Sequence, residues 1–192
     1  MHITKENINK FIHVTTMNCY DKEITHIEYI PDYITHLYCS KNKLTKLPKL
    51  PESLIYLYCY HNRLTKLPKL PKSLTHLHCS HNQLTEIHNL PDSLISLDCY
   101  NNKLTKLPKL PNGLISLYCY NNKLTELPKL PDGLESLYCG GNKLTELPKL
   151  PESLTHLYCS FNNLPYQITI HNYKEKHNKL LKRKKILSKI CV

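Results

Sequence analysis

The chain has 192 residues, with 26 Lys and Arg against 15 Asp and Glu, and a formal net charge of +11. It contains no run of about 18 consecutive apolar residues, which excludes a transmembrane helix, and its start lacks the apolar core of a signal peptide. The 13 prolines are spread through the middle of the chain and exclude long helices there.

Residues 1–13 precede the periodic part of the chain and contain a short apolar cluster. Ile8, Phe11 and Ile12 have the i, i+3, i+4 spacing that places side chains on one face of a helix. The end unit of a stacked array needs its open side covered. We therefore expect residues 1–13 to form a short helical N-terminal cap.

Residues 14–164 follow a 20-residue period. Aligned on Cys39, the pattern runs Ile34, Leu37, Cys39, Asn42, Leu44, Leu47, Pro48, Leu50 and Pro51. Further units begin at Leu54, Leu74, Leu94, Leu114, Leu134 and Leu154, and a degenerate first unit begins at Val14, which predicts eight units. A unit of 20 residues is too short to bury its apolar face alone. The units must therefore stack on one another.

Each unit is expected to contain one short strand and an extended return. Leu37-Tyr38-Cys39 alternates as a strand does, with Leu37 and Cys39 pointing inward. The Leu-Pro-Lys-Leu-Pro segment cannot form a helix, because Pro lacks an N–H group and forces the residue before it into an extended conformation. The strands of successive units are therefore expected to stack in parallel.

The motif L-x-x-L-x-C-x-x-N-x-L-x-x-L-P-x-L-P resembles a leucine-rich repeat. Its Leu-Pro form is similar to the short repeats of secreted bacterial effectors and of repeat proteins in large DNA viruses and protists. The resemblance implies a β-rich solenoid: an arc with a parallel sheet on its concave side, an extended, polyproline II convex side and short helical caps. Cys occupies a position where most members carry Leu or Val, which alters the core but not the expected fold.

Eight cysteines occupy one repeat position, and Cys191 stands apart; the eight are Cys19, Cys39, Cys59, Cys79, Cys99, Cys119, Cys139 and Cys159. Buried free thiols are the favoured interpretation. Disulfides between adjacent strands are compatible with the strand spacing, but in-register side chains point the same way and no secretion signal is visible. A zinc site would require the column to bend around the metal. An intracellular, reducing location is expected.

A second column contains one asparagine in each unit from the second to the eighth, while the first unit has Lys22 there; the asparagines are Asn42, Asn62, Asn82, Asn102, Asn122, Asn142 and Asn162. A short amide side chain carries two N–H donors and one acceptor oxygen, so it can satisfy backbone groups of a turn inside the arc. We expect this column to be structural.

The outward strand positions carry many aromatic side chains. Tyrosine is rigid and amphipathic and is common at interfaces. We predict a partner-binding surface made of Tyr38, Tyr56, Tyr58, His76, His78, Tyr118, Tyr138, His156 and Tyr158. The competing interpretation is that these rings only pack on their neighbours along the ladder. The 12 histidines show no metal-ligand spacing, so no metal or other cofactor is expected.

Residues 165–192 form a basic tail with seven Lys and one Arg against one Glu. Leu180, Leu187 and Cys191 share a helical face with Tyr173, which favours a helix that caps the last repeat. The alternatives are a nuclear-localisation or nucleic-acid patch and an anionic membrane anchor. The basic run consists of Lys182, Arg183, Lys184 and Lys185.

The sequence favours a non-enzymatic module that binds a protein partner on its concave face. No Gly-rich phosphate loop and no catalytic Ser/His/Asp or Cys/His framework appears outside the repeat columns. A monomer in the cytoplasm, with the nucleus as a second possibility, is expected. The alternative function is a nucleic-acid-associated or nuclear-targeted protein that acts through the basic tail.

Overall fold

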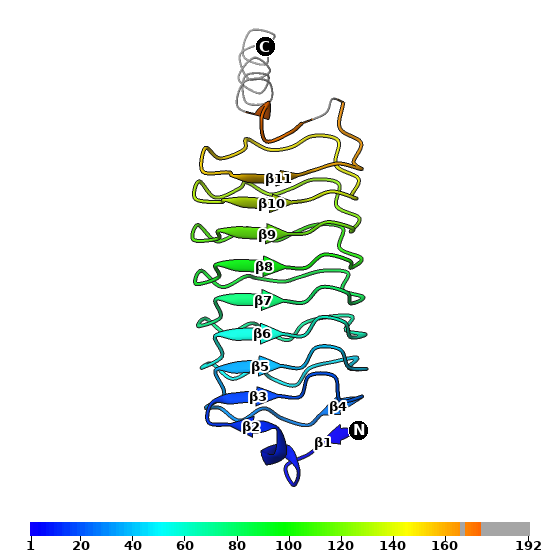
Figure 1. Cartoon of the computed structure of the whole chain (residues 1–192), viewed down its shortest axis with the longest axis vertical. Coiled ribbons are helices and arrows are strands. Elements are labelled where there is room, and N and C mark those ends of the chain that lie inside the picture. Colours follow the sequence, from blue (N-terminus) through cyan, green and yellow to red (C-terminus); the bar gives the residue numbers. More distant parts are fainter. Residues whose placement is uncertain (166–167, 174–192) are drawn as a thin grey trace.

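The strands of successive repeats stack into one elongated ladder in the computed structural model, which describes residues 1–165 and 168–173 (Figure 1). Within these residues, nine strands form one sheet in the order β11-β10-β9-β8-β7-β6-β5-β3-β2. The strands are β2 (Ile12–His13), β3 (Thr16–Asn18), β5 (His36–Tyr38), β6 (Tyr56–Tyr58), β7 (His76–His78), β8 (Ser96–Asp98), β9 (Ser116–Tyr118), β10 (Ser136–Tyr138) and β11 (His156–Tyr158). From β3 to β11 all pairs are parallel.

Every parallel pair has the same register, in which each residue lies beside the residue one repeat later. Leu37 pairs with Leu57, and Leu57 with Leu77. The middle residue of these strands is buried, while the residues beside it are half-buried from β5 to β10. Each repeat position therefore becomes a continuous column along the molecule, and the predicted parallel solenoid is confirmed.

The cysteine column lies in the core, as predicted. All eight cysteines from Cys19 to Cys159 are buried and free of disulfides. Burial raises the pKa of the Cys19 thiol to about 12 and that of Cys159 to about 11, so these thiols stay protonated at neutral pH. Cys191 lies outside the described residues.

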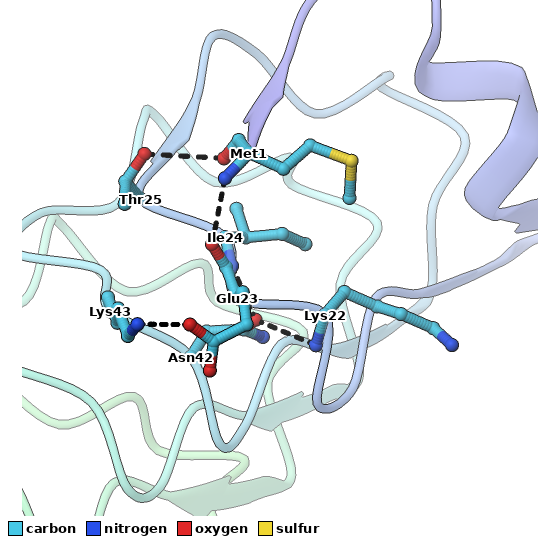
Figure 2. Close-up of polar contacts among 7 residues, drawn as sticks. All are labelled: Met1, Lys22, Glu23, Ile24, Thr25, Asn42 and Lys43. Atoms are coloured by element: carbon cyan, nitrogen blue, oxygen red, sulfur yellow. Dashed lines mark hydrogen bonds and ion pairs between the residues drawn. The ribbon is translucent and has the colours of Figure 1, made fainter.

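The asparagine column holds consecutive turns together, which confirms its predicted structural role. Asn42 Oδ1 accepts hydrogen bonds from the backbone N–H groups of Lys22 (3.1 Å) and Ile24 (2.8 Å) (Figure 2). Its Nδ2 donates to the carbonyls of Cys19 and Cys39. Each of the other asparagines accepts from one backbone N–H group and donates to the carbonyls of two column cysteines: Asn62, Asn82, Asn102, Asn122, Asn142 and Asn162.

The N-terminal segment covers the first repeat with strands and a single 3-10 turn. β1 (His2–Ile3) pairs in parallel with β4 (His26–Ile27), and η1 (Ile8–Phe11) buries Ile8. The Met1 ammonium donates to the carbonyl of Glu23, whose carboxylate pairs with Lys43 (Figure 2). Helix is therefore a minor part of this end, because β1 and β2 supply hydrogen bonds that a helix would not.

The alignment of Val14 with the buried Ile34 is wrong in structural terms. Val14 is 75% exposed and has a φ of 54°, whereas Ile34 is fully buried. β2 runs antiparallel to β3, with Ile12 beside Met17, so residues 14 and 15 form the tight turn between them. Such turns require positive φ, which explains the strained backbone at Val14.

The C-terminal end of the ladder is covered by residues 168–173. Ile168 and Tyr173 are buried, and the Tyr173 hydroxyl donates to the carbonyls of Pro151 (3.2 Å) and Leu154 (3.3 Å). The other residues of the predicted capping helix, Leu180, Leu187 and Cys191, lie outside the described part. In the described part of the chain, no helix combines the length and the apolar character needed to cross a membrane.

Candidate functional site

The concave face consists of the outward side chains of the parallel strands and of the residues just after them. The first strand residues form the first column: Thr16, His36, Tyr56, His76, Ser96, Ser116, Ser136 and His156. The last strand residues form the second column: Asn18, Tyr38, Tyr58, His78, Asp98, Tyr118, Tyr138 and Tyr158. A third column follows two residues later: Tyr20, Ser40, Tyr60, Ser80, Tyr100, Tyr120, Gly140 and Ser160.

The rings of β5, β6 and β7 form one stacked cluster. The ring centroids of His36 and Tyr56 are 4.6 Å apart, and those of Tyr56 and His76 are 4.5 Å apart. In the second column, Tyr58 lies 4.4 Å from His78 and 5.0 Å from Tyr38. Stacking of this kind fixes the rings before any partner arrives.

A threonine positions several of these histidines. Thr35 Oγ1 lies 2.8 Å from Nδ1 of His36, and Thr75 Oγ1 lies 2.8 Å from Nδ1 of His76. Thr155 and His156 repeat the contact at 2.9 Å. Each of these contacts engages Nδ1 and leaves Nε2 out of the hydrogen bond with the threonine. The Thr-His pairs were visible in the sequence but were not recognised as a positioning device.

The rings of β9, β10 and β11 form a second cluster with an open centre. Tyr118 and Tyr138 are stacked at 4.9 Å, but Tyr138 and Tyr158 are 6.4 Å apart. Tyr118, Tyr120, Tyr138 and Tyr158 line a hollow of about 390 Å³. We call this hollow the tyrosine hollow.

Between the two clusters, β8 interrupts the aromatic columns with Ser96 and Asp98 (Figure 1). Ring contacts still connect the two sides of β8, but they use residues that follow the strands. The ring centroids of His81 and Tyr100 are 5.0 Å apart, and those of Tyr100 and Tyr120 are 4.2 Å apart. Asp98 therefore lies between His78 and Tyr118 in the second column, and we call this place the polar notch.

Burial shapes the electrostatics of this notch. Burial raises the pKa of Asp98 to about 7. The hydrogen bond that the backbone N–H of Tyr100 donates to the carboxylate has the opposite, smaller effect and lowers this pKa. Burial also lowers the pKa of His76, His78 and His81. Near neutral pH these histidines are therefore mostly uncharged, and the notch changes charge when Asp98 titrates.

The structure brings most of the predicted binding residues into these two clusters. Tyr38, Tyr56, Tyr58, His76 and His78 form the first, while Tyr118, Tyr138 and Tyr158 belong to the second. His156 lies on the same strand as Tyr158 and is exposed. The predicted basic run Lys182, Arg183, Lys184 and Lys185 lies outside the described residues.

Within the described ranges, no group of three or more His, Cys, Asp or Glu side chains is placed to hold a metal ion. The described surface does contain a second hollow that sequence reasoning missed. It lies on the convex side, measures about 570 Å³ and is lined in part by Leu70, His88, Asn89 and Leu90. His88 stands where the other complete repeats carry Pro, and that departure was the available signal.

Comparison with known proteins identifies the class to which this architecture belongs. A family model described as leucine-rich repeats in two copies matches residues 52–92. No curated protein matches the chain. Among solved structures, the leucine-rich repeat domain of a Shigella effector is 30% identical, with a TM-score of 0.74, and the match covers 88% of this chain and 76% of that domain. The chain belongs to the leucine-rich repeat family.

Two further solved structures carry the similarity into longer proteins. YopM from Yersinia enterocolitica is 32% identical, with a TM-score of 0.78, over 81% of this chain but only 35% of YopM. InlJ from Listeria monocytogenes, whose functional domain includes a cysteine ladder, is 32% identical, with a TM-score of 0.66, over 80% of this chain and 41% of the InlJ chain. The chain thus spans about a third of YopM and two fifths of InlJ.

Proposed function

We propose that the chain is a non-enzymatic protein-interaction module and that its partner binds the aromatic concave face. The leucine-rich repeat family is generally an interaction scaffold, and the fold places this chain within it. The observation that carries the proposal is the pair of ring clusters on one face, which include the half-buried Tyr58 and the 39% exposed Tyr158.

The rings are not needed to close the core. Leu37, Cys39 and their equivalents fill the interior and are fully buried from the second to the seventh repeat. Aromatic side chains that remain at the surface and are already stacked offer a partner a large contact area at low entropic cost. A face that only stabilised the ladder would not need hydroxyl and imidazole groups directed toward solvent.

Site-specific photo-crosslinking locates the partner's contact. A benzoylphenylalanine residue replaces Tyr58 or Tyr138 on the concave face, and Lys109 on the exposed convex side serves as the control position. The proposal expects the same protein to be crosslinked from both concave positions and not from position 109. Crosslinking from position 109 alone would place binding elsewhere.

The purified partner then allows a direct affinity measurement. Truncating an anchoring aromatic residue at an interface costs about 2 kcal/mol or more, which corresponds to about thirtyfold in affinity. The double variant Tyr118→Ala, Tyr138→Ala should therefore stay folded but bind at least about thirtyfold more weakly. The matched control is Tyr33→Ala, since Tyr33 is 53% exposed and lies outside the strands.

The alternative function through the basic tail is tested in the same assay. A truncation for this purpose should follow Tyr173, because the Tyr173 ring is buried against the last repeat. If this truncation abolishes binding while the double tyrosine variant binds normally, the tail and not the concave face holds the partner.

A further inference from the structure

The polar notch at Asp98 contains a carboxylate whose charge is poorly compensated. Asp98 is the only acidic residue in the first and second columns. In the part of the chain that the structure describes, its ion-pair contact is His78, with Nδ1 3.8 Å from Asp98 Oδ2. Asp98 Oδ1 is buried without a hydrogen-bond partner. An unpaired oxygen in a buried carboxylate is costly, so a cation that approaches the notch is favoured.

One wall of the notch is aromatic and belongs to the tyrosine hollow. Tyr118 pairs in register with Asp98 across β8 and β9, so the two side chains lie one strand spacing apart, about 4.8 Å. Tyr120 stacks on Tyr100 with ring planes only 9° apart. The hollow thus includes Tyr118, the in-register neighbour of Asp98, and extends over β10 and β11 to Tyr158.

A glycine keeps the far side of the hollow open. Gly140 occupies the third column, where the two preceding repeats carry Tyr100 and Tyr120. A Cβ atom at Gly140 would lie 2.3 Å from Cε1 of Tyr158, so the Tyr158 ring rests directly on the glycine backbone. This placement accounts for the 6.4 Å separation between Tyr138 and Tyr158.

We propose that the tyrosine hollow and Asp98 together form a subsite for an arginine side chain of the protein partner. This inference rests on the proposed function and gives one chemical feature of the partner's contact surface. A guanidinium group is planar and weakly hydrated, so it can stack on the face of Tyr118 that Tyr138 leaves open, beside Tyr120, while its N–H groups are directed at Asp98. A lysine ammonium is a compact, strongly hydrated charge and uses a flat aromatic wall less well.

The titration of the notch supports the same occupant. Burial raises the pKa of Asp98 to about 7, so its carboxylate is mostly charged at pH 8 and mostly neutral at pH 6. The groups facing it are His78 and Cys79 from β7 and the following residue, and Tyr118 and Tyr120 from β9 and its end. The buried thiol stays protonated, and His78 gains positive charge only in acid. The protonation of Asp98 and the protonation of His78 both weaken the binding of a cation as the pH falls.

The test uses N-acetyl-arginine methylamide as the probe and its citrulline counterpart as the matched neutral probe. Citrulline replaces the guanidinium with a urea group of nearly the same shape. Binding is followed by NMR of the full chain with ¹³C-labelled tyrosine rings at millimolar probe concentration. The arginine probe should shift the ring signals of Tyr118 and Tyr120, bind more tightly at pH 8 than at pH 6, and outcompete citrulline.

Two variants with matched controls complete the experiment. Asp98→Asn should weaken arginine binding about tenfold at pH 8, because hydrogen bonds to a charged group contribute about 1.5–3 kcal/mol. It should also remove most of the pH dependence and leave only the part that comes from the charging of His78 in acid. Asp132→Asn, an exposed acid in the turn before β10, should change nothing. Gly140→Ala should displace Tyr158 and weaken binding, whereas Gly133→Ala places its Cβ in open space and should not.

Equal shifts from arginine and citrulline in the wild-type chain would overturn the subsite, and this comparison needs no variant to fold. Unchanged arginine binding by a folded Asp98→Asn chain would overturn it as well. Either result leaves the proposed function intact, because that function is judged by the double tyrosine variant against the whole partner.

Discussion

At the scale of single residues, Asp98 differs from its repeat equivalents because it carries a carboxylate. The same repeat position carries Tyr or His in six of the other repeats and Asn in the first. Its side chain is 18% exposed and has only His78 as an ion-pair partner within the described residues. A charge in such a place lowers the stability of the fold whenever it is ionised.

The stability of the chain should therefore depend on pH through Asp98. Burial raises the pKa of Asp98 from 3.8 to about 7 in the folded chain, while the unfolded chain keeps the ordinary value. Between about pH 4 and pH 7 the folded state binds the additional proton, so the free energy of unfolding falls as the pH rises through this range. Relative to wild type, Asp98→Asn should gain about 2–4 kcal/mol between pH 4 and pH 8.

Urea unfolding at several pH values measures this difference. Asp132→Asn controls for the loss of one acidic group, since Asp132 is exposed. A constant offset between Asp98→Asn and wild type from pH 4 to pH 8 would contradict the assigned titration.

The column cysteines should be protected from thiol reagents in the native protein. They are buried from Cys19 to Cys159, and burial raises their pKa values, so little reactive thiolate forms. In a Cys191→Ser background, a maleimide should label no cysteine rapidly before urea is added and eight afterwards, as counted by mass spectrometry. Rapid native labelling of several column cysteines would show that the strand faces are assigned wrongly.

At the scale of the repeat element, each asparagine joins two neighbouring turns. Asn102 accepts from the N–H of Leu84 at 3.0 Å and donates to the carbonyls of Cys79 and Cys99 at 3.1 Å each. Its removal leaves these backbone groups without partners inside the arc.

Asn102→Ala should destabilise the chain by about 2–3 kcal/mol, because orphaned buried polar groups each carry a desolvation cost. Lys109→Ala, in the exposed part of the same repeat, should change stability by less than about 0.5 kcal/mol. The midpoints of urea unfolding compare the two variants directly. Similar losses for both would refute the structural role given to the asparagine column.

The repeat element was largely predictable from the sequence because its constraints recur at every unit. A 20-residue period with fixed Leu, Cys and Asn positions leaves one consistent assignment of inward and outward faces. Singular positions were harder to predict. Val14 fits the apolar pattern, yet the β2–β3 turn places it at the surface, because pairing of the first strand outweighs the repeat register there.

The candidate site was predictable as a set of residues but not as a shape. The alternation placed Tyr118, Tyr138 and Tyr158 on one face, yet it could not show that Tyr158 rests on Gly140 and opens a hollow. The ring contacts also pass around Asp98 through Tyr100, a path that alternation along the strands does not show. Ring positions depend on the gaps that neighbouring repeats leave, and the periodic pattern does not encode those gaps.

At the scale of the whole molecule, nearly all contacts join neighbouring repeats. Each strand from β5 to β10 pairs only with its two neighbours in the sheet, which for β5 are β3 and β6 (Figure 1). The ends are closed by different means, by the β2 strand and η1 at one end and by Tyr173 at the other. The stability of such an array is a sum of repeat terms and interface terms between neighbours.

Deletion of one complete period should therefore shorten the molecule without unfolding it. Removing residues 101–120 joins Tyr100 to Asn121, and the 20-residue register is kept on both sides. The variant should keep a native far-ultraviolet spectrum, unfold at a lower urea concentration, and show an m-value lower by about one eighth, since m scales with the surface exposed on unfolding. Removing only residues 101–110 is the matched control, because it leaves half a repeat and breaks the columns. That shorter deletion should prevent cooperative folding, and if both deletions unfold the chain equally, stability is not carried by contacts between neighbouring repeats.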